Sequence, residues 1–137
     1  MNGSKVMPIR IEWDPVVANT ILYTIDSYWT WDEYLTAFMK EQTMGRSLEE
    51  APYFTIGDMT RTRLVPRGPL FSHLTYSSHT SPPNFQHAYI VSRDNFIANM
   101  MKITIQAVPH LSKTMSLVHS MEEARIKIQS RLHPIAG

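Results

Sequence analysis

The chain has 137 residues, of which 43% are hydrophobic and 10% aromatic, and its formal net charge is +1. This composition is typical of a single folded domain, here expected over residues 1–137 with a core at about 9–132, and the balanced charge argues against a nucleic-acid partner. Cysteine is absent, which excludes disulfides, thiol catalysis and thiolate metal sites. The N-terminus lacks the apolar core of a signal peptide and no stretch is apolar over ~20 residues, so we expect a cytoplasmic protein with no integral membrane segment.

Two strands and a helix are predicted in the first third of the chain. Residues 9–13 (IRIEW) alternate apolar and charged side chains, and residues 21–26 (ILYTID) are β-branched and aromatic, so the short turn between them predicts a hairpin. Thr30 and Glu33 have the spacing of a capping box and predict a helix that begins there and ends near Gly45. The predicted buried face of this helix consists of Trp31, Leu35, Phe38 and Met39.

Strands and helices alternate in the middle of the chain. Residues 53–58 (YFTIGD) and 86–92 (QHAYIVS) are predicted strands, because they are short apolar runs bounded by turn residues. Residues 68–78 lie between them and predict a short helix with Pro69 in its first turn. A longer helix is predicted over residues 94–107. Its expected buried face comprises Phe96, Met100, Ile103 and Ala107, widened by Ile97, Met101 and Ile105.

A last strand and a last helix complete the pattern. Residues 114–119 (TMSLVH) predict the strand, and Ser120 with Glu123 predicts a second capping box. The helix that follows should bury Ala124, Ile128 and Leu132. The resulting order is β-β-α-β-α-β-α-β-α, which predicts an α/β fold with a mostly parallel sheet, an antiparallel N-terminal pair and helices that cover the sheet.

Three strings within this pattern carry a family resemblance: TWDEYLTAF at the first helix, YIVSRDNFIANMMKI from strand to helix, and SLVHSMEEARIKI from the last strand to the last helix. With the element order, they make the chain similar to the STAS domain, the fold of sporulation-type anti-sigma-factor antagonists. The resemblance covers about residues 9–132. It implies a STAS-like fold and a bacterial, non-catalytic regulatory or protein-interaction domain, whose partner is another protein or a second copy in a homodimer.

The loop after the third predicted strand is the main candidate site. STAS antagonists carry Asp-Ser-Ser-Gly there, and a partner kinase phosphorylates one serine, so the resemblance implies an interaction or phospho-acceptor loop. This chain keeps the aspartate and offers two threonines, but it lacks Ser-Ser-Gly; its three arginines suit a docked phosphate, an external anion or a plain charged turn. The candidate residues are Asp58, Thr60, Arg61, Thr62, Arg63 and Arg67. We expect residues 59–67 to form an exposed loop, because buried arginines need partners.

Four aromatic side chains gather around the start of the first helix: Tyr28, Trp29, Trp31 and Tyr34. One helix face cannot bury them all, so we expect Trp31 to point inward. Tyr28, Trp29 or Tyr34 would then be exposed as interface aromatics. The alternative is that all four pack against the edge of the sheet.

Other side chains support less specific chemistry. Three histidines lie six and eight positions apart without the pattern of metal ligands: His73, His79 and His87. Three aspartates each follow a predicted strand and could gather at one sheet edge: Asp14, Asp26 and Asp58. We expect no metal, cofactor or catalytic residue. Two alternatives to an interaction domain stay open. The first is a domain that binds a small apolar ligand between sheet and helices, which the resemblance implies through lipid-binding relatives of this fold, and the second is a small enzyme with a His or Asp base.

Overall fold

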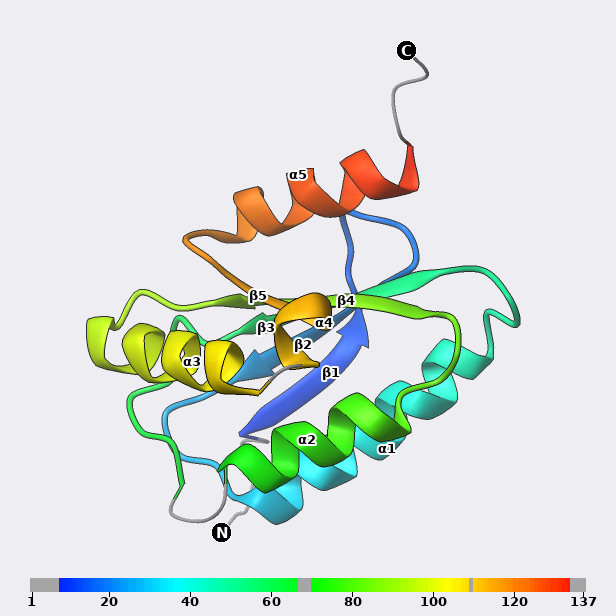
Figure 1. Cartoon of the computed structure of the whole chain (residues 1–137). Helices are drawn as coiled ribbons and strands as arrows, with labels where there is room; N and C mark the ends of the chain where they lie inside the picture. The colour runs from blue at the N-terminus through cyan, green and yellow to red at the C-terminus, as the bar shows by residue number, and fades with distance from the viewer. Residues whose placement is uncertain (1–7, 67–69, 109, 134–137) are drawn as a thin grey trace, which may run out of the picture.

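In the part of the chain that the structure describes, five strands form one sheet, and their spatial order is the same as their order in the chain (Figure 1). The structure is a computed structural model that describes residues 8–66, 70–108 and 110–133. Its elements are β1 (Ile9–Trp13), β2 (Thr20–Ile25), α1 (Trp31–Arg46), β3 (Tyr53–Asp58), α2 (Leu70–Thr80), β4 (Phe85–Val91), α3 (Asn95–Ala107), α4 (Leu111–Thr114), β5 (Met115–Val118) and α5 (Met121–Leu132). β1 and β2 pair antiparallel and all later neighbours pair parallel, which confirms the predicted fold class. None of the described helices is long and apolar enough to span a bilayer.

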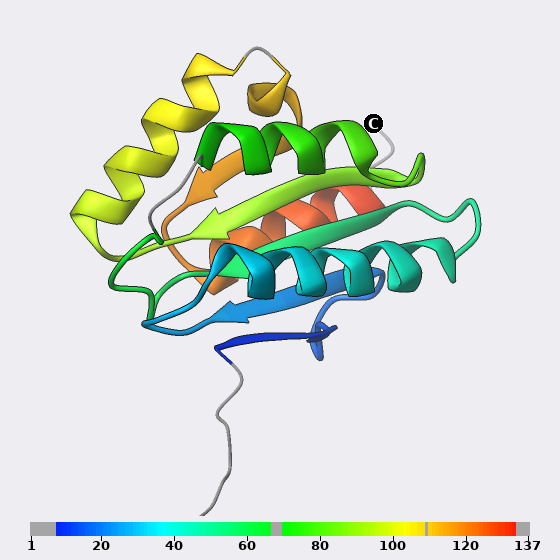
Figure 2. The same cartoon turned by 90° about the horizontal axis from the view of Figure 1, so that it is seen from below.

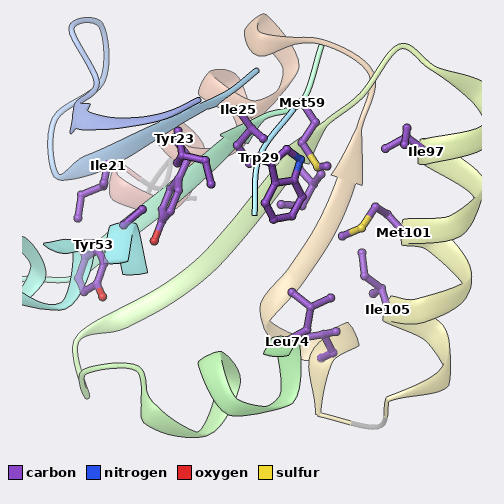
Figure 3. Packing of buried hydrophobic residues seen from close by; sticks show 14 residues of the cluster. Ile21, Tyr23, Ile25, Trp29, Tyr53, Met59, Leu74, Ile97, Met101 and Ile105 are labelled. Carbon is purple, nitrogen blue, oxygen red and sulfur yellow. The ribbon is translucent and has the colours of Figure 1, made fainter. Parts of the chain in front are cut away.

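Alternation along the strands separates two hydrophobic cores, one on each face of the sheet. In β3, Tyr53 belongs to the core under α1, α2, α3 and α4, whereas Phe54 and Ile56 belong to the core under α5. The two views in Figures 1 and 2 agree that α5 alone covers its face of the sheet. Figure 3 shows the larger core, to which Trp29 contributes from the loop before α1 and Met101 from α3.

Helix α1 begins at the predicted capping box. Thr30 Oγ1 accepts a hydrogen bond from the Glu33 N–H (3.2 Å), and the Glu33 carboxylate accepts one from the Thr30 N–H (2.8 Å). The helix passes Gly45, where it was expected to stop, and ends one residue later. Gly45 is buried against the ring of Tyr53, and a Cβ atom there would lie 2.5 Å from two ring carbons. The glycine therefore allows close packing of α1 on β3.

The buried face of α3 is only part of the predicted one: Ile97, Met101 and Ile105 are buried as predicted, but most of the central stripe is not. Its buried residues are Ile97, Met101, Thr104 and Ile105, whereas Phe96 (72% exposed), Ile103 (64%) and Ala107 point to solvent. Both stripes have helical spacing, so periodicity could not choose between them. Asp94 Oδ1 accepts the Ile97 N–H at 3.0 Å and caps the start of the helix. In α1 the prediction also fails for Met39, which is 66% exposed.

The sequence did not predict α4, the single turn before β5. One turn is too short for a periodic pattern, although its Leu111 is only 1% exposed. At the start of α5, Ser120 Oγ accepts the Glu123 N–H at 3.0 Å, as predicted. The Glu123 carboxylate accepts the His119 N–H rather than that of Ser120, so only half of the predicted capping box forms.

Candidate functional site

The loops that follow β2, β3 and β4 lie at one edge of the sheet, because these strands are parallel and their carboxyl ends point the same way. The loops are residues 26–30, 59–66 and 92–94, and Figure 2 shows them on the left, beyond the arrowheads. We call five of the exposed side chains in these loops and in the first turn of α3 the carboxyl-edge surface: Tyr28, Arg61, Arg63, Leu64 and Phe96.

Hydrogen bonds between the loops hold this surface together. Ser27 Oγ donates to the backbone oxygen of Arg61 at 3.1 Å, and Thr62 Oγ1 donates to the backbone oxygen of Ile25 at 3.0 Å. The backbone N–H of Met59 donates to the backbone oxygen of Val91, the last residue of β4, at 2.8 Å. The loop after β3 is therefore fixed to its neighbours on both sides.

Asp58 anchors the predicted site, but it does not pair with an arginine. Its Oδ1 accepts hydrogen bonds from the N–H of Thr60 (3.0 Å) and from the Thr60 hydroxyl (2.7 Å). Arg61 and Arg63 are exposed and form no ion pair with any described residue. Arg67 lies outside the described residues. Two of the three arginines are thus free to contact a partner.

Two residues of the same loop point inward. The prediction that residues 59–67 form an exposed loop is wrong for Met59 (4% exposed), which joins the larger core, and for Thr62 (2% exposed), whose hydroxyl is bonded to backbone. A kinase cannot reach the Thr62 hydroxyl in this conformation. Thr60 is partly exposed, but the Asp58 carboxylate beside it would repel an added phosphate. Phosphorylation of Thr60 stays a prediction.

Of the three predicted interface aromatics, only Tyr28 is strongly exposed, at 74%. Trp29 is 8% exposed, lies deeper than Trp31 and contacts its ring edge-to-face with 5.0 Å between ring centroids. Tyr34 is partly buried, and its hydroxyl shares a 2.7 Å hydrogen bond with Ser77 Oγ. Because Trp29 precedes the helix, helical periodicity could not predict whether its side chain points into the core or to solvent. Its burial removes it from the interface candidates.

A cavity of about 100 Å³ lies between the sheet and helices α1, α2 and α4. Aromatic rings form much of its wall: Tyr23, Trp29, Trp31, Tyr34, Phe38 and Phe85. The sheet contributes small residues, Thr55, Gly57 and Ala88, which leave space that the rings do not fill. The indole N–H of Trp29 is buried without a hydrogen-bond partner among the described residues.

A buried carboxylate forms part of the cavity wall. Glu41 of α1 is 4% exposed; its Oε1 accepts a hydrogen bond from the Tyr23 hydroxyl (2.6 Å) and its Oε2 accepts one from the Tyr53 hydroxyl (2.8 Å). Burial raises the pKa of Glu41, and the two hydrogen bonds partly oppose that rise. Burial and the neighbouring carboxylate raise the pKa of both tyrosines. The carboxylate therefore joins α1 to β2 and β3, and both of its oxygens are occupied.

The aspartates that follow the first three strands do not gather at one edge, contrary to the expectation. β1 runs antiparallel to β2, which places Asp14 at the edge opposite to Asp26 and Asp58. Asp14 is buried and forms an ion pair with Arg125 at 2.8 Å. The topology thus rules out a shared acid–base centre of the three.

The histidines are dispersed among different elements. His87 Nε2 lies 2.7 Å from Ser116 Oγ, and burial lowers the pKa of His87 to about 4. His73 stacks on Trp31 with 4.4 Å between ring centroids, and His79 is exposed on α2. The described residues contain no group of three His, Asp or Glu side chains close enough to hold a metal ion.

Sequence analysis left open an apolar ligand site between sheet and helices, but it identified neither the residues that line the cavity nor the buried carboxylate. A usable signal exists, because Glu41 lies three and four positions after Phe38 and Ala37, both buried, and so stands on the buried stripe of α1. Comparison with protein-family models, with curated proteins and with solved structures finds no match.

Proposed function

We propose that the chain is a non-catalytic, STAS-like interaction domain whose carboxyl-edge surface binds a protein partner. The observation that carries this proposal is the combination, on one fixed edge, of exposed apolar side chains and arginines that form no ion pair with any described residue. Tyr28, Leu64 and Phe96 are 74%, 57% and 72% exposed. Large apolar side chains beside arginines are the composition of interface centres, which are enriched in aromatic residues and arginine.

The fixed geometry of the loops supports the same proposal. Hydrogen bonds from Ser27, Met59 and Thr62 hold the loop after β3 before any partner binds. A surface fixed in this way loses little conformational entropy on association. The two arginines favour a partner surface that is apolar at its centre and acidic beside it.

The carboxylates of the fold support a non-catalytic role. Glu41 accepts two tyrosine hydroxyls, Asp58 accepts the N–H and hydroxyl of Thr60, and Asp14 pairs with Arg125. Each of them serves a hydrogen bond that holds secondary structure or a loop in place. A general base has to be free to take a proton from a substrate.

A matched pair of variants tests the surface. The triple variant Tyr28→Ala, Arg61→Ala, Arg63→Ala alters only exposed side chains, so its melting temperature should stay close to that of the native chain. The control, Trp13→Ala with Ile126→Ala, removes exposed apolar side chains (42% and 54%) away from this edge. We expect the triple variant to lose a protein that the native chain and the control both retain from a lysate of the source cells. Equal retention by all three would contradict the proposal.

Self-association is the second form that this interaction can take, as a homodimer. Sedimentation velocity at several concentrations distinguishes a dimer from a monomer. If the carboxyl-edge surface is the dimer contact, the triple variant should sediment as a monomer at concentrations at which the control sediments as a dimer.

A small apolar ligand is the second candidate function, and the aromatic cavity favours it. Binding sites for small molecules are concave, mostly apolar and equipped with a few polar groups that fix orientation. The cavity has a mostly apolar wall, and the polar residues Glu41, Thr55 and Ser77 are also part of its lining. Native mass spectrometry of freshly purified protein would detect a retained ligand as added mass.

A further inference from the structure

Strand β1 has an open side. It lies at one edge of the sheet, and among the described residues β2 alone pairs with it (Figure 2). Just after β1, the Asp14 N–H donates to the backbone oxygen of Thr20 at 2.7 Å. Because antiparallel strands alternate between hydrogen-bonded and non-bonded pairs, the even-numbered residues of β1 share this direction and bond β2. The odd-numbered residues point their backbone N–H and C=O groups to the open side: Ile9, Ile11 and Trp13.

The Lys40 side chain agrees with this direction. Its Nζ atom donates to the backbone oxygen of Ile11 at 3.4 Å, which is long for a hydrogen bond. The open edge of a sheet is a template for a further strand, and a lysine placed along it is a common protection. Lys40 is exposed and its bond to the edge is long, so an incoming strand displaces it at little cost.

We infer that β1 pairs antiparallel with β1 of a second copy of this chain, in the register that places Ile11 opposite Ile11. The two sheets then continue into one another across a two-fold axis. In this register Ile9 lies opposite Trp13 of the second copy, and Arg10 lies opposite its Glu12. Every outward-pointing residue of β1 meets another, so the open backbone groups form hydrogen bonds. The inference is independent of the carboxyl-edge surface, which stays available to a protein partner.

Charge selects both this register and this partner. Arg10 and Glu12 are exposed and form no ion pair with any described residue. They flank Ile11, so pairing about Ile11 places each Arg10 opposite a Glu12, in non-hydrogen-bonded pairs whose side chains approach most closely. Moving the axis by one residue would place Arg10 opposite Arg10, or Glu12 opposite Glu12, which is destabilising. The strand is thus complementary to itself, which favours a second copy over an unrelated strand.

A groove beside β1 fits the Trp13 ring of the second copy. The groove has a volume of about 500 Å³, lies between β1 and α1, and has Ile9, Ile11 and Ala37 in its wall. Trp13 is 42% exposed and lies opposite Ile21, on the face of the sheet that α1 covers. Opposite residues of an antiparallel pair point to the same face. Trp13 of the second copy therefore stands beside Ile9 and covers the apolar part of the groove.

Sedimentation velocity with exchanged charges tests the contact. Arg10→Glu places glutamates opposite each other and Glu12→Arg places arginines opposite each other, so each variant alone should dimerise about ten-fold or more weakly than the native chain. Both side chains are exposed, so both melting temperatures should stay close to native. Mixed in equal amounts, the two variants should form a heterodimer of nearly native strength, because every pair then joins opposite charges. A native chain that is monomeric at every soluble concentration, single variants that dimerise as the native chain does, or a mixture that fails to associate would each overturn the inference.

Amide hydrogen exchange identifies the strand that forms the contact. In the dimer the Ile11 N–H is bonded to the second copy, so its exchange should slow about ten-fold or more as the protein concentration rises through the dimer range. The Arg10 N–H bonds β2 in both states, so its exchange should not change. An Ile11 N–H that exchanges at the same rate in monomer and dimer would place the contact elsewhere and contradict the inference.

Variants of the two surfaces separate this contact from the carboxyl-edge surface. The triple variant Tyr28→Ala, Arg61→Ala, Arg63→Ala should dimerise as the native chain does. Trp13→Ala with Ile126→Ala removes the ring that enters the groove and should dimerise more weakly, which is the reverse of the order expected for a dimer through the carboxyl-edge surface. That opposite order would overturn the inference. Loss or retention of a protein partner by the triple variant leaves these results unchanged.

Discussion

At the scale of single residues, Glu41 shows how one carboxylate can be kept inside an apolar core. It lies on the buried face of α1 and accepts hydrogen bonds from tyrosines on two neighbouring strands. Burial raises its pKa, so the folded state holds a proton on Glu41 more readily than the unfolded chain does. This part of the stability is therefore present at low pH and is lost as pH rises from the ordinary glutamate range, about 4.3, through the raised pKa.

Tyr23→Phe should make the loss of stability with rising pH larger. Without the Tyr23 hydroxyl, the ionised Glu41 loses one of two donors, which raises its pKa further and costs about 1.5–3 kcal/mol of unfolding free energy near neutral pH. Because a protonated carboxyl needs the donor less, the cost should shrink toward pH of about 4. Urea unfolding of both proteins across this range measures the difference.

Tyr34→Phe is the matched control. Its hydroxyl bonds the Ser77 hydroxyl rather than a carboxylate, so its cost should be about 0.5–1.5 kcal/mol and independent of pH. In a Glu41→Gln background, the effect of Tyr23→Phe should likewise lose its pH dependence. A cost of Tyr23→Phe that is flat with pH in the native background would mean that Glu41 stays in one protonation state throughout.

At the scale of elements, the sequence predicted those boundaries of strands and helices that nearby residues determine. The bounds of β3 match the prediction because Pro52 and the turn after Asp58 limit the run, and α1 starts where Thr30 and Glu33 cap it. The sequence could not show which side of α3 is buried, because Ile97 and Ile103 lie on two different apolar stripes of the helix. The residues that line the cavity could not be predicted either, since the cavity exists only where residues distant in sequence leave a space between them.

Helix caps offer a direct test of the element boundaries. Thr30→Ala and Ser120→Ala each remove a hydroxyl that accepts the N–H of a residue three positions on, and each should cost about 1 kcal/mol of unfolding free energy. Thr36→Ala is the control within α1, where the hydroxyl bonds only the turn before it and alanine is the better helix former, so stability should stay the same or rise. Equal costs at Thr30 and Thr36 would mean that α1 starts elsewhere.

The orientation of α3 can be tested with two identical substitutions. Ile97→Ala removes a side chain with no exposed area and should cost about 2–5 kcal/mol, because it leaves a cavity under the helix. Ile103→Ala acts on a side chain that is 64% exposed and should change stability by less than about 0.5 kcal/mol. Chemical unfolding of both variants measures the contrast. The opposite order would place the predicted stripe, with Phe96 and Ile103, against the sheet.

At the scale of the whole molecule, the carboxyl-edge surface and the cavity share the same two loops. In the loop before α1, Tyr28 is 74% exposed and its neighbour Trp29 forms the cavity wall. In the loop after β3, Leu64 is 57% exposed and its neighbour Val65 also lines the cavity. Consecutive residues thus lie on the carboxyl-edge surface and on the cavity wall, which gives the two proposed sites a short physical connection.

This connection predicts that the two sites influence each other. A ligand that displaces Trp29 and Val65 should also move their neighbours Tyr28 and Leu64, so a small apolar ketone such as cyclopentanone, at saturation, should change the affinity for a captured partner by about five-fold or more. The partner must change the affinity for cyclopentanone by the same factor, because coupling between two binding equilibria is reciprocal. Titration calorimetry of each ligand in the presence of the other measures both factors. Ala88→Val, which fills the cavity without touching the surface, should abolish the effect of the probe while leaving partner affinity in its absence close to native. Identical partner affinity with and without the probe in the native chain would mean that the shared loops are rigid enough to keep the two sites independent.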